Sequence, residues 1–129
     1  MSGRFLPPDH SRGDANTIGG YAAVHARPAA FEGSDGMSYS VEIVVDETEI
    51  MGRPYGAYFM FLKWRRMGVQ GIEGHLETDY LAYGASEDAA RAAIGAMTLS
   101  EVKHMLDELI REHAASRPTR KWWDAMRDE

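Results

Sequence analysis

The chain has 129 residues, a formal net charge of -6 and no cysteine, which fits one domain with its own core and excludes disulfide frameworks, zinc ribbons and thiol catalysis. Hydrophobic residues make up 44% and charged residues 26%, the composition of a globular protein rather than a disordered one. The acidic balance disfavours nucleic acid and anionic membrane surfaces, which attract lysine and arginine, and no apolar run reaches the roughly 18 residues needed to cross a bilayer.

The first twenty residues are rich in Gly, Pro, Ser and Asp, and their apolar residues recur with neither the helix nor the strand period. This composition predicts a flexible N-terminal arm over 1–20. They hold no continuous apolar segment of the kind found in signal peptides, so we expect a cytoplasmic protein. Residues 21–32 are predicted as an edge strand interrupted by Pro28, because proline removes a hydrogen-bond donor. The run Gly33-Ser34-Asp35-Gly36 then predicts a hairpin turn.

The middle of the chain predicts three further strands. Apolar and polar side chains alternate over residues 37–46, with Tyr39 and Val41 on the apolar side. Residues 55–66 form the densest apolar and aromatic run and are expected in mid-sheet, and residues 70–78 follow as a third strand. At a period of two, the central strand has one face that we expect to meet the helices and one that points away: Tyr58, Met60, Leu62 and Trp64 on the first, and Phe59, Phe61, Lys63 and Arg65 on the second.

Two helices are predicted to close the domain. Ser86 is a good N-cap for the first, and Thr98 with Glu101 forms a capping box at the start of the second. We expect the second helix to end at Arg117-Pro118, followed by a C-terminal tail over 117–129. The order of elements predicts a single α+β domain over 21–116, an antiparallel β-meander of about four strands packed on one face by two C-terminal α-helices.

The segment Leu81-Ala82-Tyr83-Gly84-Ala85-Ser86-Glu87-Asp88-Ala89 follows strands that begin at Tyr39 and Tyr58. It resembles the strand-to-helix passage of HicB-type antitoxin domains, in which a Gly-x-Ser/Thr-x-Glu-Ala-like segment follows a short meander. The resemblance covers this passage alone, and no function is carried over from the family. The family's strand after the helix is replaced here by the amphipathic helix from Leu99.

The face pointing away from the helices is the predicted site. Pairing Trp64 with Ile72 would place Lys63 beside Glu73, Phe61 beside His75 and Phe59 beside Glu77. Four interpretations follow: a solvated face with cross-strand ion pairs, a protein interface, a platform for single-stranded nucleic acid, or a metal or acid–base set formed by Glu73, His75 and Glu77.

We therefore expect a small non-catalytic protein-interaction module that forms a homodimer. Its contacts would come from the open sheet face or from the tail; the candidate residues are Phe59, Phe61, Lys63, Arg65, His75, Trp122 and Trp123. Two alternatives stay open: a single-stranded nucleic-acid-binding domain that uses sheet aromatics and basic residues, and a metal-dependent enzyme centred on Glu73, His75 and Glu77. The phosphate-binding glycine loops and the nucleophile elbow are missing from the sequence, so no cofactor is expected and an enzyme is disfavoured.

Overall fold

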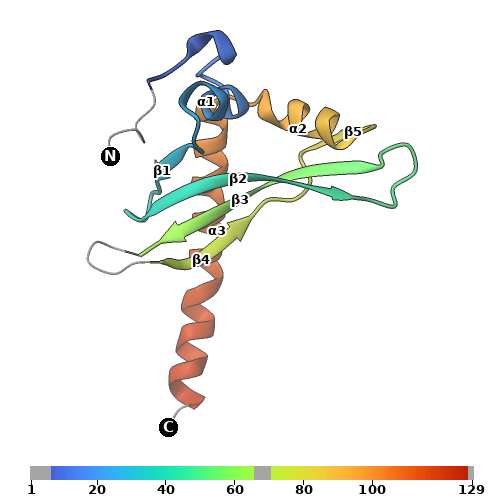
Figure 1. Cartoon of the computed structure of the whole chain (residues 1–129). Coiled ribbons are helices and arrows are strands. Elements are labelled where there is room, and N and C mark those ends of the chain that lie inside the picture. The colour runs from blue at the N-terminus through green and yellow to red at the C-terminus, as the bar shows by residue number, and fades with distance from the viewer. Residues whose placement is uncertain (1–6, 66–70, 128–129) are drawn as a thin grey trace.

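A computed structural model describes residues 7–65 and 71–127 of the chain, with side chains as far as Ala114. It confirms the predicted α+β class, with an antiparallel meander and two C-terminal helices (Figure 1). The elements in order are η2 (a 3-10 helix, His10–Arg12), α1 (Ile18–His25), β1 (Ala30–Glu32), β2 (Ser38–Glu47), β3 (Tyr55–Trp64), β4 (Ile72–Glu77), β5 (Ala82–Gly84), α2 (Glu87–Gly95) and α3 (Leu99–Arg127).

The sheet is built around the long hairpin of β2 and β3. These strands pair antiparallel along their whole length, from Ser38 opposite Trp64 to Glu47 opposite Tyr55. The strand order is β1-β2-β3-β4, and the short β5 pairs with the part of β3 that β4 leaves free. The predicted strands over 37–46, 55–66 and 70–78 appear as β2, β3 and β4, and their predicted ends at residues 66 and 70 lie outside the described residues. Strand β5 was not predicted as a separate strand.

All three α-helices lie on one face of the sheet. In Figure 1 the strands pass in front of α3, and α1 and α2 lie together near its start. The core forms between the helices and this face. It joins inward side chains of β2 and β3 to apolar residues spaced along α2 and α3: Tyr39, Val41, Ala57, Phe59, Phe61, Ala90, Ile94, Val102, Leu106 and Ile110.

The buried face and the open face of β3 are the reverse of those predicted. Phe59 and Phe61 are 0% exposed and belong to the core, so they do not lie on the open face. The physical reason is the pairing with β2, in which Phe61 lies opposite Val41, and directly paired residues share one face of a sheet. Since β3 is apolar on both faces, its own alternation could not make this choice.

A register shift between β3 and β4 corrects a second prediction. Trp64 lies opposite Ile72 as expected, but the pairing is irregular between Lys63 and Trp64, and Lys63 lies opposite Gly74. One additional residue on one strand moves every later side chain to the other face. As a result, His75 pairs with Leu62 rather than with Phe61.

The N-terminal prediction is wrong for residues 18–25, which form α1 instead of the end of an arm and the start of a strand. The Thr17 hydroxyl caps this helix by accepting from the Gly20 N–H at 3.0 Å, and Ile18 is buried in the core. A Cβ on Gly19 would lie 3.0 Å from the Gly95 Cα, so α1 approaches α2 closely. Gly19 thus serves this contact, although glycine weakens the helical pattern in the sequence. Of the predicted strand, only β1 remains.

Both predicted helix starts are confirmed. The Ser86 Oγ accepts from the Ala89 N–H at 3.1 Å, and the Thr98–Glu101 capping box makes both of its hydrogen bonds, at 2.9 and 3.1 Å. The predicted end at Pro118 is wrong, because α3 continues to Arg127 and in Figure 1 extends well past the sheet. A proline removes one helical N–H, which weakens a helix without always ending it. In the described part of the chain, no helix has the length and hydrophobicity that crossing a membrane requires.

Asp107 ties the turn before β2 to α3. Its Oδ1 accepts from the Ser34 N–H at 2.9 Å, and its Oδ2 accepts from the Lys103 Nζ at 2.6 Å. The hydrogen bond from Lys103, together with that from Ser34, lowers the pKa of the Asp107 carboxyl group. A carboxyl pKa that is lower in the folded state contributes stability above its unfolded value, and the contribution is lost as the pH falls through the folded value.

We expect Asp107→Asn to reduce the free energy of unfolding by about 1 kcal/mol near neutral pH. The difference from wild type should shrink as the pH falls below about 4, where the wild-type carboxylate is itself protonated. Urea unfolding at several pH values measures this, with Glu112→Gln on the exposed side of α3 as the control. A difference that does not change with pH would contradict the role given to the charge.

Candidate functional site

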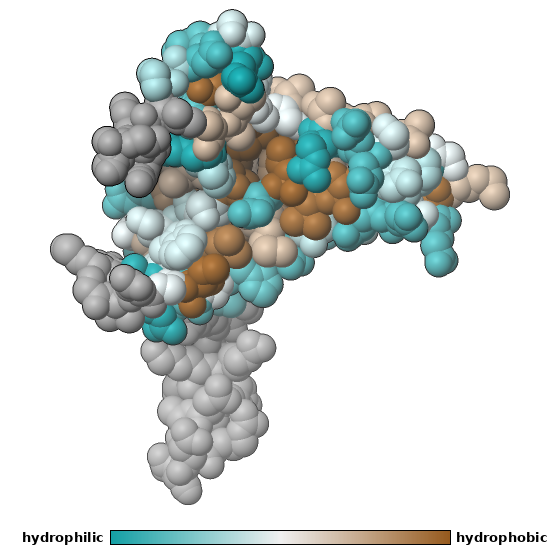
Figure 2. All heavy atoms as spheres, in the orientation of Figure 1, coloured by the Kyte–Doolittle hydropathy of each residue, from teal (hydrophilic) through white to brown (hydrophobic). Residues whose placement is uncertain are grey.

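An apolar stripe runs along the face of the sheet that points away from the helices. No element in the described part of the chain covers it, and Trp64 and Ile72 are 38% and 46% exposed. In Figure 2 this face is toward the viewer, and brown apolar surface gathers over the strands. We call it the outer stripe, formed by six side chains that share this face through the β2–β3–β4 register: Val44, Tyr58, Met60, Leu62, Trp64 and Ile72.

Polar groups border the outer stripe on both sides. Glu42 and Glu77 flank Met60 from β2 and β4. His75 and Glu77 lie 3.4 Å apart, and both are largely exposed. The Trp64 indole N–H donates to the Ser40 Oγ at 2.9 Å. An apolar centre with a polar border is the usual anatomy of a protein–protein interface.

The candidate residues Phe59 and Phe61 are inside the protein, with ring centroids 6.1 Å apart. Neither can contact a partner or stack on a base in this fold, since both are fully buried. The nucleic-acid hypothesis loses its two central aromatics for this reason. Arg65 is exposed just beyond β3, and its backbone N–H donates to the Gly71 carbonyl at 3.1 Å.

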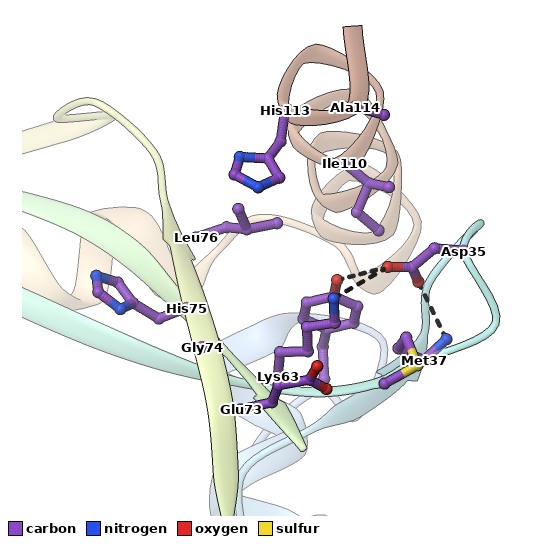
Figure 3. Close-up of a pocket in the computed structure, with 11 residues that line it drawn as sticks. Asp35, Met37, Lys63, Glu73, Gly74, His75, Leu76, Ile110, His113 and Ala114 are labelled. Atoms are coloured by element: carbon purple, nitrogen blue, oxygen red, sulfur yellow. Dashed lines mark hydrogen bonds and ion pairs between the residues drawn. The ribbon is translucent and has the colours of Figure 1, made fainter. Parts of the chain in front are cut away.

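Lys63 lies on the helix-facing side, at a pocket of about 820 Å³ between β4 and α3 (Figure 3). Its Nζ is 4.0 Å from the Asp35 Oδ2, which also accepts from the Tyr39 hydroxyl at 2.8 Å. Burial, and then the neighbouring Asp35 carboxylate, raises the pKa of Tyr39. The phenol therefore stays protonated and serves as a hydrogen-bond donor rather than as a base.

The pocket has the size of a small-molecule site, and Leu76 and Ile110 give it an apolar wall (Figure 3). Its cation and its Asp35 carboxylate already interact with each other.

The predicted metal set of Glu73, His75 and Glu77 is not brought together. Glu73 and His75 both border the pocket, but Glu73 lies beside Lys63 and the His75 side chain leaves β4 in another direction (Figure 3). The shift between Lys63 and Trp64 causes this separation. Within residues 7–65 and 71–114, no group of three or more histidine and acidic side chains is arranged to hold a metal ion.

The Trp122 and Trp123 side chains lie outside the described side chains, so their predicted docking stays a prediction. Five residues of the outer stripe were missed from the sequence, because they were assigned to the buried face: Tyr58, Met60, Leu62, Trp64 and Ile72. One signal could have found them: residues 38–46 carry Ser38, Ser40 and Glu42 on one side, and pairing the two long strands places this polar side with Met60 and Leu62.

Comparison of the chain with models of known protein families, with characterised proteins and with solved structures finds no match.

Proposed function

We propose that this chain is a non-catalytic protein-interaction module that self-associates, as a homodimer, through the outer stripe. The carrying observation is a row of four large side chains along β3, Tyr58, Met60, Leu62 and Trp64, that no described helix covers. Covering such a stripe removes apolar surface from water, which stabilises an assembly by about 25 cal/mol per Å² before the costs of association.

The register favours a second copy as the occupant, because the face is complementary to itself. A two-fold axis in the plane of the interface would cross β3 at right angles between Met60 and Leu62. It would set Met60 of one copy against Leu62 of the other. Since β4 pairs Glu77 with Met60 and His75 with Leu62, the same axis would bring Glu77 toward His75 of the second copy. Such reciprocal contacts are a property of two-fold interfaces.

Charge sets a condition on this association. Each copy carries a net charge of -6, so two copies repel each other electrostatically. Dissolved salt screens this repulsion and therefore favours association. The cysteine-free sequence is compatible with a reducing compartment, and we place the module in the cytoplasm as part of the proposal.

Sedimentation equilibrium of wild type and Met60→Glu tests the proposal. We expect a wild-type dimer that strengthens with added salt, and an association at least about a hundredfold weaker in Met60→Glu, because a buried unpaired carboxylate costs several kcal/mol. Met51→Glu is the matched control, since it makes the same substitution at a methionine that is 95% exposed in the β2–β3 loop. It should associate as wild type does.

Circular dichroism checks that both variants keep the fold. A wild-type chain that stays monomeric at the highest soluble concentration would refute self-association. A Met60→Glu variant that is folded and associates as strongly as wild type would place the interface elsewhere on the molecule.

A further inference from the structure

Aromatic and acidic side chains surround a second pocket at the β5 end of the open sheet face. Its volume is about 480 Å³. Three tyrosines and three carboxylates line it: Tyr58, Tyr80, Tyr83, Asp46, Glu77 and Asp79.

The backbone holds the three rings in place. Tyr58 is on β3, Tyr83 is on β5 opposite Gly56, and Tyr80 lies over Gly56, where a Cβ would come within 2.7 Å of its ring. The ring centroids of Tyr58 and Tyr80 are 5.9 Å apart, as are those of Tyr80 and Tyr83. The Tyr80 hydroxyl donates to the Asp46 Oδ2 at 3.0 Å, which fixes the middle ring.

The lining of the pocket is acidic. Among the described residues that line it, none is a lysine, arginine or histidine. The hydrogen bond to Asp46 raises the pKa of Tyr80, and burial, followed by the charges of Glu77 and Asp46, raises the pKa of Tyr58. These two phenols stay neutral, so what they offer a cation is the π face of the ring and not a phenolate charge.

A second observation shows what these rings attract. The guanidinium of Arg53 lies over the Tyr83 ring, 4.9 Å from its centroid. The acids at this end of the sheet do not form a metal site, because no such group occurs in the described part of the chain. Carboxylates spread around aromatic faces suit a large cation with diffuse charge better than a small hard one.

We propose that this pocket binds a small organic cation of the quaternary ammonium class, with its charged group against the Tyr58, Tyr80 and Tyr83 rings and the carboxylates balancing the charge. Aromatic faces grouped around a methylated ammonium are a known means of recognition. The site goes beyond self-association, since a single chain supplies the whole of it. It shares only Tyr58 with the outer stripe.

Titration of the full chain with choline, followed in amide NMR spectra, tests the site. We expect saturable shifts that centre on β5 and on the segment between β4 and β5. The neutral carbon analogue of choline, in which a tert-butyl group replaces the trimethylammonium group, should produce no such shifts at the same concentrations. Repeating the titration on Met60→Glu keeps this test separate from self-association, whichever way that proposal is decided.

Two kinds of variant locate the binding. Tyr58→Leu and Tyr80→Leu should each weaken choline binding about tenfold through loss of a cation–π contact, and Glu77→Gln with Asp79→Asn should weaken it without removing a ring. The double charge variant keeps the test decisive if a tyrosine variant fails to fold. Tyr21→Leu is the control, because Tyr21 also has an arginine over its ring, at 5.4 Å, but lies on α1.

Three results would overturn the proposal. Choline could fail to bind; the neutral analogue could bind equally well, which would mean recognition of shape alone; or folded ring and charge variants could bind choline as wild type does, which would place it elsewhere.

Discussion

Replacing Phe61 with alanine is expected to lower the free energy of unfolding by about 3–5 kcal/mol, the usual cost of removing a large core aromatic. Phe61 is 0% exposed and packs in the cluster that joins β2 and β3 to α2 and α3. Its neighbour Leu62 is half-buried on the opposite face, so Leu62→Ala should cost only about 1 kcal/mol.

Denaturant unfolding of both variants in the Met60→Glu background measures the difference. That background removes any contribution of self-association to the stability of Leu62. A Leu62→Ala cost equal to or greater than that of Phe61→Ala would restore the face assignment expected from the sequence pattern. The experiment therefore tests the premise on which the outer stripe depends.

Gly84→Ala is expected to destabilise the chain by about 1–3 kcal/mol through overpacking. A Cβ on Gly84 would lie 2.4 Å from the Ala90 nitrogen and 2.8 Å from the Ala89 carbonyl carbon. These are backbone atoms of α2, which cannot move aside as a flexible side chain could. Accommodating the methyl group would push β5 away from α2, and with it Tyr83 of the second pocket.

Gly74→Ala is the matched control for Gly84→Ala. Gly74 lies in β4, and a Cβ there would meet nothing within 4 Å. Its replacement should be neutral or stabilising by about 0.5 kcal/mol, because alanine restricts the unfolded chain. Thermal unfolding of the two variants compares them directly, and equal effects would mean that the β5–α2 contact is not tight in solution.

The sequence was most informative where a single element carried its own signal. The alternation over 37–46 located β2 and its buried face, since Tyr39 and Val41 are in the core. Capping chemistry located the starts of α2 and α3 to the residue. The amphipathic helix expected from Leu99 is α3, whose apolar face holds the core residues Val102 and Leu106, because a helical period needs no knowledge of the rest of the fold.

Other features depended on contacts between distant segments. Helix α1 has a weak local signal, since two of its residues are Gly19 and Gly20, and its place follows from the approach of Gly19 to Gly95. The shift between Lys63 and Trp64 is a property of two strands together. It separated Glu73 from His75, which a regular alternation would have placed on one face.

By itself, then, the sequence determined the α+β class, the main strands, the helix starts and the apolar faces of β2 and α3. Only the tertiary structure decided which face of β3 is buried, and with it where a partner could bind. The physical reason is that β3 is apolar on both sides, so its alternation permits either orientation. Pairing with the one-sided strand β2 places Phe59 and Phe61 under the helices and leaves Met60 and Leu62 on the open face.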